Sequence, residues 1–174
     1  MTAAEVAEAT YDEMATDAGG KYLTFGLADE VYGLEILKVR EIIGMMDITA
    51  VPRTPEEVVG VINLRGNVIP IIDLRLKFGM PREKRTEETC MIVVDVDGVQ
   101  IGVVVDRVLE VLDIPVGGIQ DAPSFGVDVN TDFILGIGKA GDRVTILLDI
   151  ARVLNTDAAR LVAGAQAASE ERES

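Results

Sequence analysis

The sequence contains no histidine and no tryptophan, and aromatic residues make up only 4% of its 174 residues. Without histidine, the chain cannot build a Ser-His-Asp triad, a histidine phosphotransfer site or an imidazole metal site. The scarcity of aromatic side chains argues against sites that stack sugars or nucleobases. These absences exclude several common kinds of catalytic and ligand-stacking site.

Cysteine is almost missing as well, since Cys90 is the only one. A single cysteine cannot form an intramolecular disulfide, which fits a reducing compartment. Cys90 lies in the apolar run 89–94 without a basic neighbour, so we expect a buried, unreactive thiol. No apolar run approaches the roughly 18 residues of a membrane span, and the N-terminus has no signal-peptide pattern. We therefore expect a cytoplasmic protein without membrane insertion.

Basic residues are few, 16 against 30 acidic ones, which gives a net charge of −14. Nucleic acid phosphates and anionic lipids repel such a protein, so we expect neither as a partner. Residues 1–20 contain no basic residue, and we expect them to form an acidic flexible tail. Basic residues gather instead in mid-chain: Arg65, Arg75, Lys77, Arg82, Lys84 and Arg85. This cluster is either a solvated face or a face that attracts an acidic partner.

From Lys21 onward, the sequence has the pattern of short strands and tight turns. Runs rich in Val, Ile, Leu and Tyr alternate with Gly, Asp and Pro, which is typical of β-structure. Turn residues between apolar runs predict β-hairpins at Asp29-Glu30, Arg65-Gly66, Asp97-Gly98 and Gly141-Asp142. Helical signals are short and begin at aspartates that can cap a helix: 73–78, 149–154 and 157–168.

An internal repeat organises the chain. At an offset of 69 residues Gly33 aligns with Gly102, and at an offset of 76 Ile71 aligns with Leu147. Each copy holds about five short strands, and a small closed barrel suits that number because it leaves no open sheet edge. The sequence thus predicts an all-β fold. Its parts are two β-barrel subdomains at 21–79 and 89–154, a linker between them at 80–88, and a C-terminal helix and tail at 155–174.

No group of residues has the spacing of a known catalytic or cofactor site. Asp95 and Asp97 resemble the start of a calcium loop, but Gln100 and Asp106 stand where that loop needs glycine and glutamate. The segment 136–139 resembles part of a phosphate loop but lacks the following Ser or Thr. We therefore predict no enzyme and no cofactor. The alternative is a small-ligand or carboxylate-metal barrel in which Asp95, Asp97 and Asp106 surround a cation.

The motif GVINLRGNVIPIIDLR at residues 60–75 resembles the signature of the CheW family of chemotaxis scaffold proteins. Further blocks resemble the family in the same order along the chain: 32–42, 48–52, 101–108 and 134–138. The resemblance covers about residues 21–154 and depends on the blocks as a set. It implies two SH3-like five-stranded β-barrels side by side, with short helices, and no enzymatic activity.

The resemblance also implies partners. Such a protein couples methyl-accepting chemotaxis receptors to the regulatory domain of the histidine kinase CheA, is monomeric when free and is recruited to receptor arrays. The alternative is a coupling protein of a non-chemotaxis kinase pathway. A receptor helix would lie in the groove between the barrels. The family's receptor-contact region falls on these residues: Val39, Glu41, Gly60, Asn63, Arg65, Gly102 and Val105. Gly102 and Val105 are expected on the neighbouring barrel.

A structural role competes with receptor contact at several of these positions. Arg65 and Glu41 have opposite charges, so they could pair with each other and hold the hairpin in place. Gly60 and Gly66 are expected to serve backbone geometry. The sequence leaves both roles open for Arg65.

Overall fold

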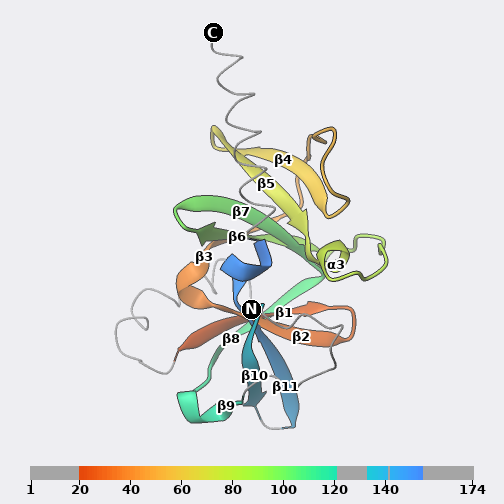
Figure 1. Ribbon diagram of the computed structural model, residues 1–174. Helices are drawn as coiled ribbons and strands as arrows, with labels where there is room; N and C mark the ends of the chain where they lie inside the picture. Colours follow the sequence, from red (N-terminus) through yellow and green to blue (C-terminus); the bar gives the residue numbers. More distant parts are fainter. Residues whose placement is uncertain (1–19, 121–132, 141, 155–174) are drawn as a thin grey trace.

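The structure is a computed structural model that describes residues 20–120, 133–140 and 142–154. It consists of two packed β-sheets with short helices, which confirms the predicted mainly β fold (Figure 1). The six-stranded sheet has the order β8 (Arg107–Asp113), β1 (Lys21–Leu27), β2 (Glu30–Glu35), β11 (Arg143–Leu148), β10 (Ile134–Ala140) and β9 (Ile119–Gln120). The five-stranded sheet has the order β3 (Val39–Gly44), β6 (Cys90–Val96), β7 (Val99–Val105), β5 (Asn67–Asp73) and β4 (Val58–Leu64).

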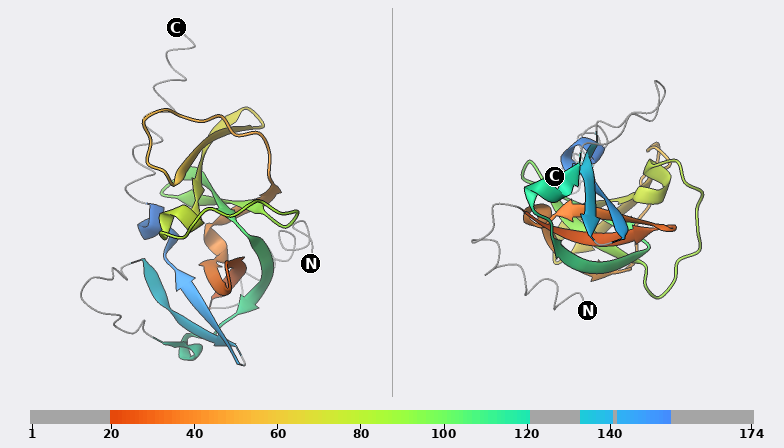
Figure 2. Two further views of the ribbon diagram at one scale, coloured as in Figure 1. Left: turned by 90° about the vertical axis from the view of Figure 1, so that its right-hand side faces the viewer. Right: turned by 90° about the horizontal axis from the view of Figure 1, so that it is seen from below.

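The two sheets do not coincide with the two halves of the chain. The hairpin β1–β2 joins β8 and the hairpin β10–β11, which come from the second half. Reciprocally, the hairpin β6–β7 joins β3 and the hairpin β4–β5 from the first half. Residues 80–88 contain no helix or strand, as expected for a linker, but this linker does not separate the sheets. Figure 2 shows the sheets from two further sides.

The strand registers follow the internal repeat. Parallel pairing places Leu147 of β11 opposite Gly33 of β2, and Ile71 of β5 opposite Gly102 of β7. A Cβ atom on Gly33 would lie 2.9 Å from the Leu147 side chain, and one on Gly102 would lie 2.6 Å from Ile71. Both glycines therefore make room for a large side chain on the neighbouring strand, and the repeat is a repeat of structure.

Two predicted hairpin turns are confirmed by their backbone angles. Arg65 and Gly66 have φ values of 51° and 89°, and Asp97 and Gly98 have values of 51° and 85°. The first hairpin turns one residue earlier than predicted, because Glu30 already pairs with Leu27 and belongs to β2. The turn predicted at Gly141-Asp142 lies between β10 and β11, but Gly141 itself is outside the described residues.

Three apolar clusters hold the sheets together. The largest contains side chains of both sheets and therefore lies between them, whereas the two smaller clusters each belong to one sheet. Strand β6 contributes to two of them, since Ile92 and Val94 enter the large cluster and Met91 and Val93 enter the cluster of the five-stranded sheet. Phe25, Tyr32, Phe78 and Phe133 stack in one file, with ring centroids 5.9, 5.8 and 5.3 Å apart.

Two of the predicted helices are present as single turns. Helix α3 (Leu74–Lys77) begins after Asp73, whose carboxylate accepts hydrogen bonds from the N–H groups of Arg75 and Leu76. A second turn spans residues 150–154, after Asp149. The helix predicted at 157–168 and the expected tails at 1–19 and 155–174 lie outside the described residues. No helix in the described ranges is long and apolar enough to cross a membrane.

Candidate functional site

Arg65 and Glu41 form an ion pair on the five-stranded sheet. Arg65 occupies the turn between β4 and β5, and Glu41 lies on β3. The Nη2 group of Arg65 donates to both carboxylate oxygens of Glu41, at 2.7 and 2.5 Å. Because β3 and β4 are the two edge strands of this sheet, the pair brings its two edges together. This contact confirms that Arg65 and Glu41 pair with each other.

The same ion pair remains open to a partner. The Arg65 side chain is 69% exposed, whereas that of Glu41 is 29% exposed. Only the Nη2 group of Arg65 is used in the contacts described. The guanidinium therefore keeps N–H groups on Nη1 and Nε that could donate to an acidic group. Bracing the hairpin and contacting a partner are compatible roles for this side chain.

A β-bulge shapes the strand that carries Glu41. Val39 pairs with Val94 and Glu41 with Val93, so Arg40 is the extra residue of the bulge. Arg40 pairs with Asp95 on β6 at 2.8 Å. This hydrogen bond, together with one from the N–H of Gly98, lowers the pKa of Asp95. Strand β3 thus takes part in two neighbouring ion pairs.

Some of the other predicted site residues lie at the surface, and others lie in the interior. Asn63 is exposed, and its side-chain oxygen accepts a hydrogen bond from the N–H of Gly66 at 2.9 Å. Val39 is half-buried against the large apolar cluster. Gly60, Gly102 and Val105 are buried, so they cannot contact a partner directly in this conformation.

The structure also corrects the expected place of Gly102 and Val105. Both lie on β7, in the same five-stranded sheet as the other predicted residues, and not on a neighbouring unit. The cause is the reciprocal exchange of strands between the halves, which brings β6 and β7 beside β3 and β5. Six of the seven predicted residues therefore lie on strands of one sheet, and Arg65 lies in the turn between two of its strands.

The alternative of a carboxylate-metal site does not fit the geometry. Asp95 and Asp97 lie at the β6–β7 turn, whereas Asp106 follows the opposite end of β7. Asp95 pairs with Arg40 and Asp106 with Arg75, so both carboxylates already have a cationic partner. In the part of the chain that the structure describes, no three acidic, cysteine or histidine side chains could hold one metal ion.

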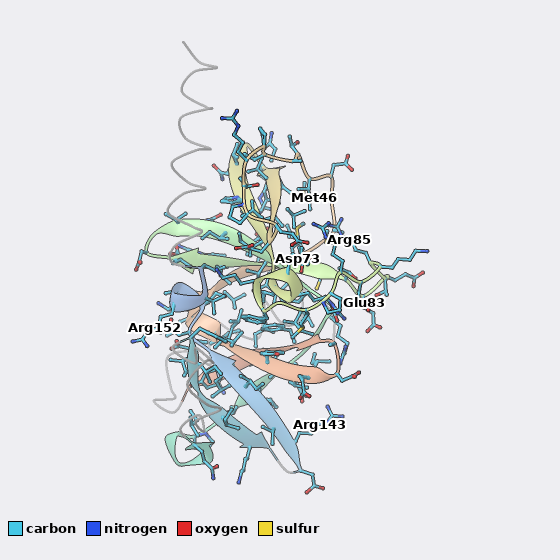
Figure 3. All side chains as sticks on the ribbon, turned by 45° about the vertical axis from the view of Figure 1, so that its right-hand side comes forward. Met46, Asp73, Glu83, Arg85, Arg143 and Arg152 are labelled. Atoms are coloured by element: carbon cyan, nitrogen blue, oxygen red, sulfur yellow. The ribbon has the colours of Figure 1, made fainter. Side chains whose placement is uncertain are left out.

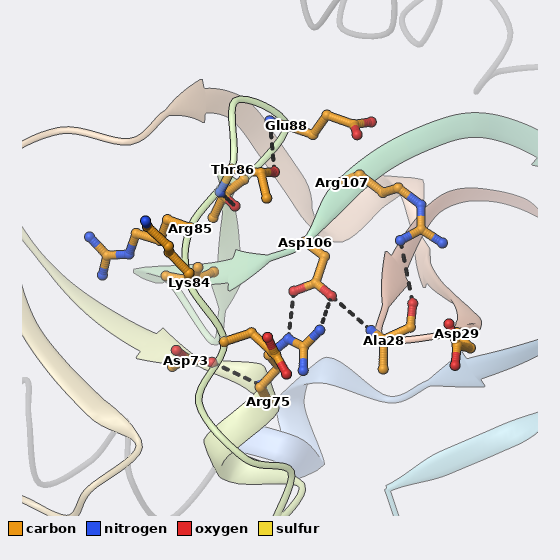
Figure 4. A pocket seen from close by; sticks show the side chains of 13 residues that line it. Ala28, Asp29, Asp73, Arg75, Lys84, Arg85, Thr86, Glu88, Asp106 and Arg107 are labelled. Atoms are coloured by element: carbon orange, nitrogen blue, oxygen red, sulfur yellow. Dashed lines mark hydrogen bonds and ion pairs between the residues drawn. The ribbon is translucent and has the colours of Figure 1, made fainter.

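Sequence reasoning missed a further ion pair, between Arg75 and Asp106. Arg75 Nε and Nη2 donate to the two carboxylate oxygens of Asp106 at 2.7 and 2.5 Å, and the N–H of Ala28 donates to one of them at 2.8 Å (Figure 4). Burial acts to raise the pKa of Asp106, but these hydrogen bonds outweigh it and hold that pKa below its ordinary value. The sequence shows both residues, but nothing in it indicates that they meet.

A cavity of about 320 Å³ lies beside the ion pair of Arg75 and Asp106. Its lining includes side chains of both charges, among them Lys84, Arg85, Asp29 and Glu88. Arg85 and Glu83 belong to the linker beside α3, as Figure 3 shows. The balance of charges in the lining gives the cavity no preference for an anion or a cation.

Cys90 is half-buried in β6, rather than fully buried as expected. Burial raises the pKa of its thiol, although a backbone hydrogen bond from Val108 acts in the opposite direction. The thiol form is therefore favoured at neutral pH, which agrees with the low reactivity expected for this residue.

The comparisons with known proteins connect this arrangement to one family. A family model described as the CheW-like domain matches residues 21–158. The chain is 40% identical over 155 residues to a "Chemotaxis protein CheW" of Klebsiella aerogenes, covering 88% of this chain and 93% of the relative. It is 39% identical over 137 residues to the protein of that name from Helicobacter pylori, covering 79% and 82% respectively.

A solved structure agrees with these matches. The crystal structure of the scaffolding protein TtCheW from Thermoanaerobacter tengcongensis superimposes with a TM-score of 0.72 at 36% sequence identity. The similarity covers 78% of this chain and 92% of that protein. It therefore extends to both sheets.

Proposed function

The chain belongs to the CheW family, and from this premise we propose that it is a chemotaxis coupling adaptor that links chemoreceptors to the histidine kinase CheA. An adaptor acts by presenting surfaces to other proteins, so it needs no catalytic groups. The family members named above are scaffold and chemotaxis proteins, which supports a role in assembly rather than turnover. In this proposal the protein works in the cytoplasm, at the receptor tips, and is a monomer when free.

The observation that carries the proposal furthest is the exposed ion pair of Arg65 and Glu41. It fixes the direction of a guanidinium whose remaining N–H groups face solvent, at the tip of a hairpin. A fixed arginine loses little conformational freedom on binding, and arginine is frequent among residues that dominate binding energy. We place receptor contact on the exposed or half-exposed members of the predicted set: Val39, Glu41, Asn63 and Arg65.

The buried members of the set act indirectly in this proposal. Gly60 allows the edge strand β4 to approach Thr49, and Gly102 allows β5 to approach β7. Val105 fills the large apolar cluster at the end of β7. These three residues would support the binding surface by holding the strands that carry it.

Charge reversal at Arg65 tests whether it contacts the receptor. We expect Arg65→Glu to weaken binding to a receptor cytoplasmic fragment by roughly 1–3 kcal/mol, because an attractive guanidinium becomes a carboxylate. The free energy of unfolding should change by no more than about 1 kcal/mol, since the pair is largely exposed. Titration calorimetry measures the first quantity, and thermal unfolding followed by circular dichroism measures the second.

A swapped pair separates contact from bracing. The double variant Glu41→Arg with Arg65→Glu restores an ion pair of reversed polarity, so it should recover stability while receptor binding stays weak. Full recovery of binding would assign Arg65 a structural role only. Arg143→Glu is the matched control, because it reverses an exposed arginine on the other sheet. We expect this control to bind receptor like the wild type.

Reconstitution tests the adaptor role itself. Addition of the protein to CheA and receptor fragments should make kinase autophosphorylation depend on the receptor. Autophosphorylation that stays the same with and without the protein, while all components are folded, would contradict the proposed function.

A further inference from the structure

The chain passes between the two sheets at two equivalent points. The first crossing leads from β2 to β3 through η1 (Ile36–Lys38), and the second leads from β7 directly to β8. The offset of 69 residues that aligns Gly33 with Gly102 also aligns Leu37 with Asp106. The two crossings are therefore related by the internal repeat, and their side chains can be compared position by position.

The two crossings differ sharply in their side-chain contacts. At the second crossing, Asp106 accepts hydrogen bonds from Arg75, which follows the five-stranded sheet, and from the N–H of Ala28, in the β1–β2 turn of the six-stranded sheet. Figure 4 shows the carboxylate between these two groups. At the first crossing the equivalent residue, Leu37, is 71% exposed. One crossing is thus tied by a charged group, and the other is not.

Asp106 differs from the other acidic groups described above in what it connects. The ion pairs Arg65–Glu41 and Arg40–Asp95 each join strands of the five-stranded sheet, and Lys21–Asp113 joins strands of the six-stranded sheet. The carboxylate of Asp106 instead joins the two sheets. Besides the hydrogen bond from the Asp106 N–H to the carbonyl oxygen of Gly26 at 3.1 Å, the sheets pack through a large apolar cluster, and apolar contacts have no preferred direction. Charge-assisted hydrogen bonds do have one, so this group can fix the angle between the sheets.

We propose that Asp106, Arg75 and the N–H of Ala28 form a latch that fixes the orientation of the two sheets, with the unlatched crossing at Leu37 acting as the hinge. The side chains of the latch are largely shielded, 14% exposed for Arg75 and 25% for Asp106, so solvent weakens the tie little. Opening the latch allows the sheets to shift along their apolar interface, as packed layers do in hinge and shear motions.

A functional consequence follows, and it rests on the proposed adaptor role. If partners bind to different sheets, the latch determines how they are oriented relative to each other. Asp106 and Arg75 are then positioning residues for coupling, because they bind each other and the N–H of Ala28. Loss of the latch should leave each pairwise affinity intact and reduce only the influence of the receptor on the kinase.

Distances between spin labels on the two sheets test the latch without any partner. Val68 on β5 and Val144 on β11 are exposed, 48% and 51%, and stand at equivalent positions of the repeat. In a Cys90→Ala background, Val68→Cys and Val144→Cys accept the labels, and pulsed electron paramagnetic resonance measures the distance distribution. The wild-type pair should give one narrow peak, and addition of Asp106→Asn should broaden or shift it.

Matched variants keep this experiment decisive. Asp113→Asn removes a carboxylate from an ion pair within one sheet, the pair with Lys21, so it should leave the peak unchanged. Arg75→Lys retains the charge but not the two-pronged contact, so it should broaden the peak even if Asp106→Asn does not fold. A narrow, unshifted peak in a folded Asp106→Asn or Arg75→Lys protein would overturn the latch, as would equal broadening by Asp113→Asn.

The receptor-dependent kinase assay tests the functional consequence separately. Asp106→Asn should bind receptor fragment and kinase with wild-type affinity but lose receptor control of autophosphorylation. If the wild-type protein itself gives no such control, the adaptor role fails while the distance result stands. If the variant retains full control despite a broadened peak, the latch exists but does not transmit the signal.

Discussion

At the scale of single residues, exposure decides what each ion pair of this protein contributes. Arg65 is 69% exposed, and an ion pair so open to water contributes little to folding, whatever its geometry. Arg75 is only 14% exposed and holds Asp106 through two hydrogen bonds. The first pair is therefore suited to recognition, and the second is suited to holding the fold.

The low pKa of Asp106 makes part of the stability depend on pH. An unfolded aspartate has a pKa of about 3.9, and the folded value lies below it. The contribution of Asp106 to the free energy of unfolding is thus fully present above the unfolded pKa and is lost as the pH falls through the folded pKa. Asp106→Asn should be less stable than the wild type at neutral pH, and this difference should shrink below about pH 4.

Urea unfolding of both proteins across this pH range, followed by circular dichroism, measures the difference. The other titrating carboxylates are common to the two proteins and largely cancel. A difference that grows as the pH falls would contradict the assignment of a lowered pKa to Asp106.

At the scale of secondary-structure elements, local sequence determined the turns but not the strand partners. Residues such as Arg65-Gly66 and Asp97-Gly98 predict a turn because a tight hairpin needs positive φ at neighbouring positions. Strands β3 and β8 occupy equivalent places in the repeat, so each could pair with hairpin β1–β2 or with hairpin β6–β7. In the structure, each strand pairs with the hairpin from the other half of the chain, which no local pattern of residues indicates.

The same limitation explains which contacts of the candidate site could be predicted from the sequence and which could not. Arg65 and Glu41 were predictable as a pair because both lie in the first half of the chain and in one sheet. Gly102 and Val105 were assigned to another unit, because the repeat suggested that each half folds separately. The ion pair of Arg75 and Asp106 was missed for the same reason, since it forms only when β5 and β7 are neighbours.

Hairpin β4–β5 offers a comparison of two glycines that have positive φ angles. Gly60 has a φ of 149°, and a Cβ atom there would lie 2.1 Å from the carbonyl oxygen of Thr49. Gly66 has a φ of 89°, with no atom within 4 Å of the same position. Gly66→Ala should cost about 1–2 kcal/mol of stability from backbone strain alone. Gly60→Ala should cost more than about 3 kcal/mol, because a backbone atom must move as well.

Thermal unfolding of the two variants measures this contrast. Because the chain has no tryptophan, circular dichroism is a suitable signal. Equal losses for the two substitutions would show that strand β4 adapts to the added methyl group and that Thr49 does not constrain it.

At the scale of the whole molecule, neither half of the chain contains a complete sheet. The fragment 1–88 has β1 and β2 without β8, and β4 and β5 without β7; the fragment 89–174 lacks the converse partners. Each fragment alone should therefore show no cooperative unfolding transition. Mixed in equal amounts, the two should assemble into a folded complex with the circular dichroism spectrum of the intact chain.

Size-exclusion chromatography and thermal unfolding of the fragments, separate and mixed, check this expectation. A cooperative transition in either fragment alone would show that a half-chain can satisfy its own strands. That result would restore the simpler picture of two independently folded units on one chain.

The reciprocal exchange also has a consequence for the origin of the repeat. A protein with a single copy of the unit would find the missing neighbours of its first hairpin only in a second molecule. Two such molecules would supply each other's missing strands and form an intertwined homodimer with twofold symmetry. Joining the copies through residues 80–88 turns that association into an intramolecular one, which no longer depends on protein concentration. A fused chain can also carry different residues in its two copies, as it does at the crossings, where Asp106 stands at the position equivalent to Leu37.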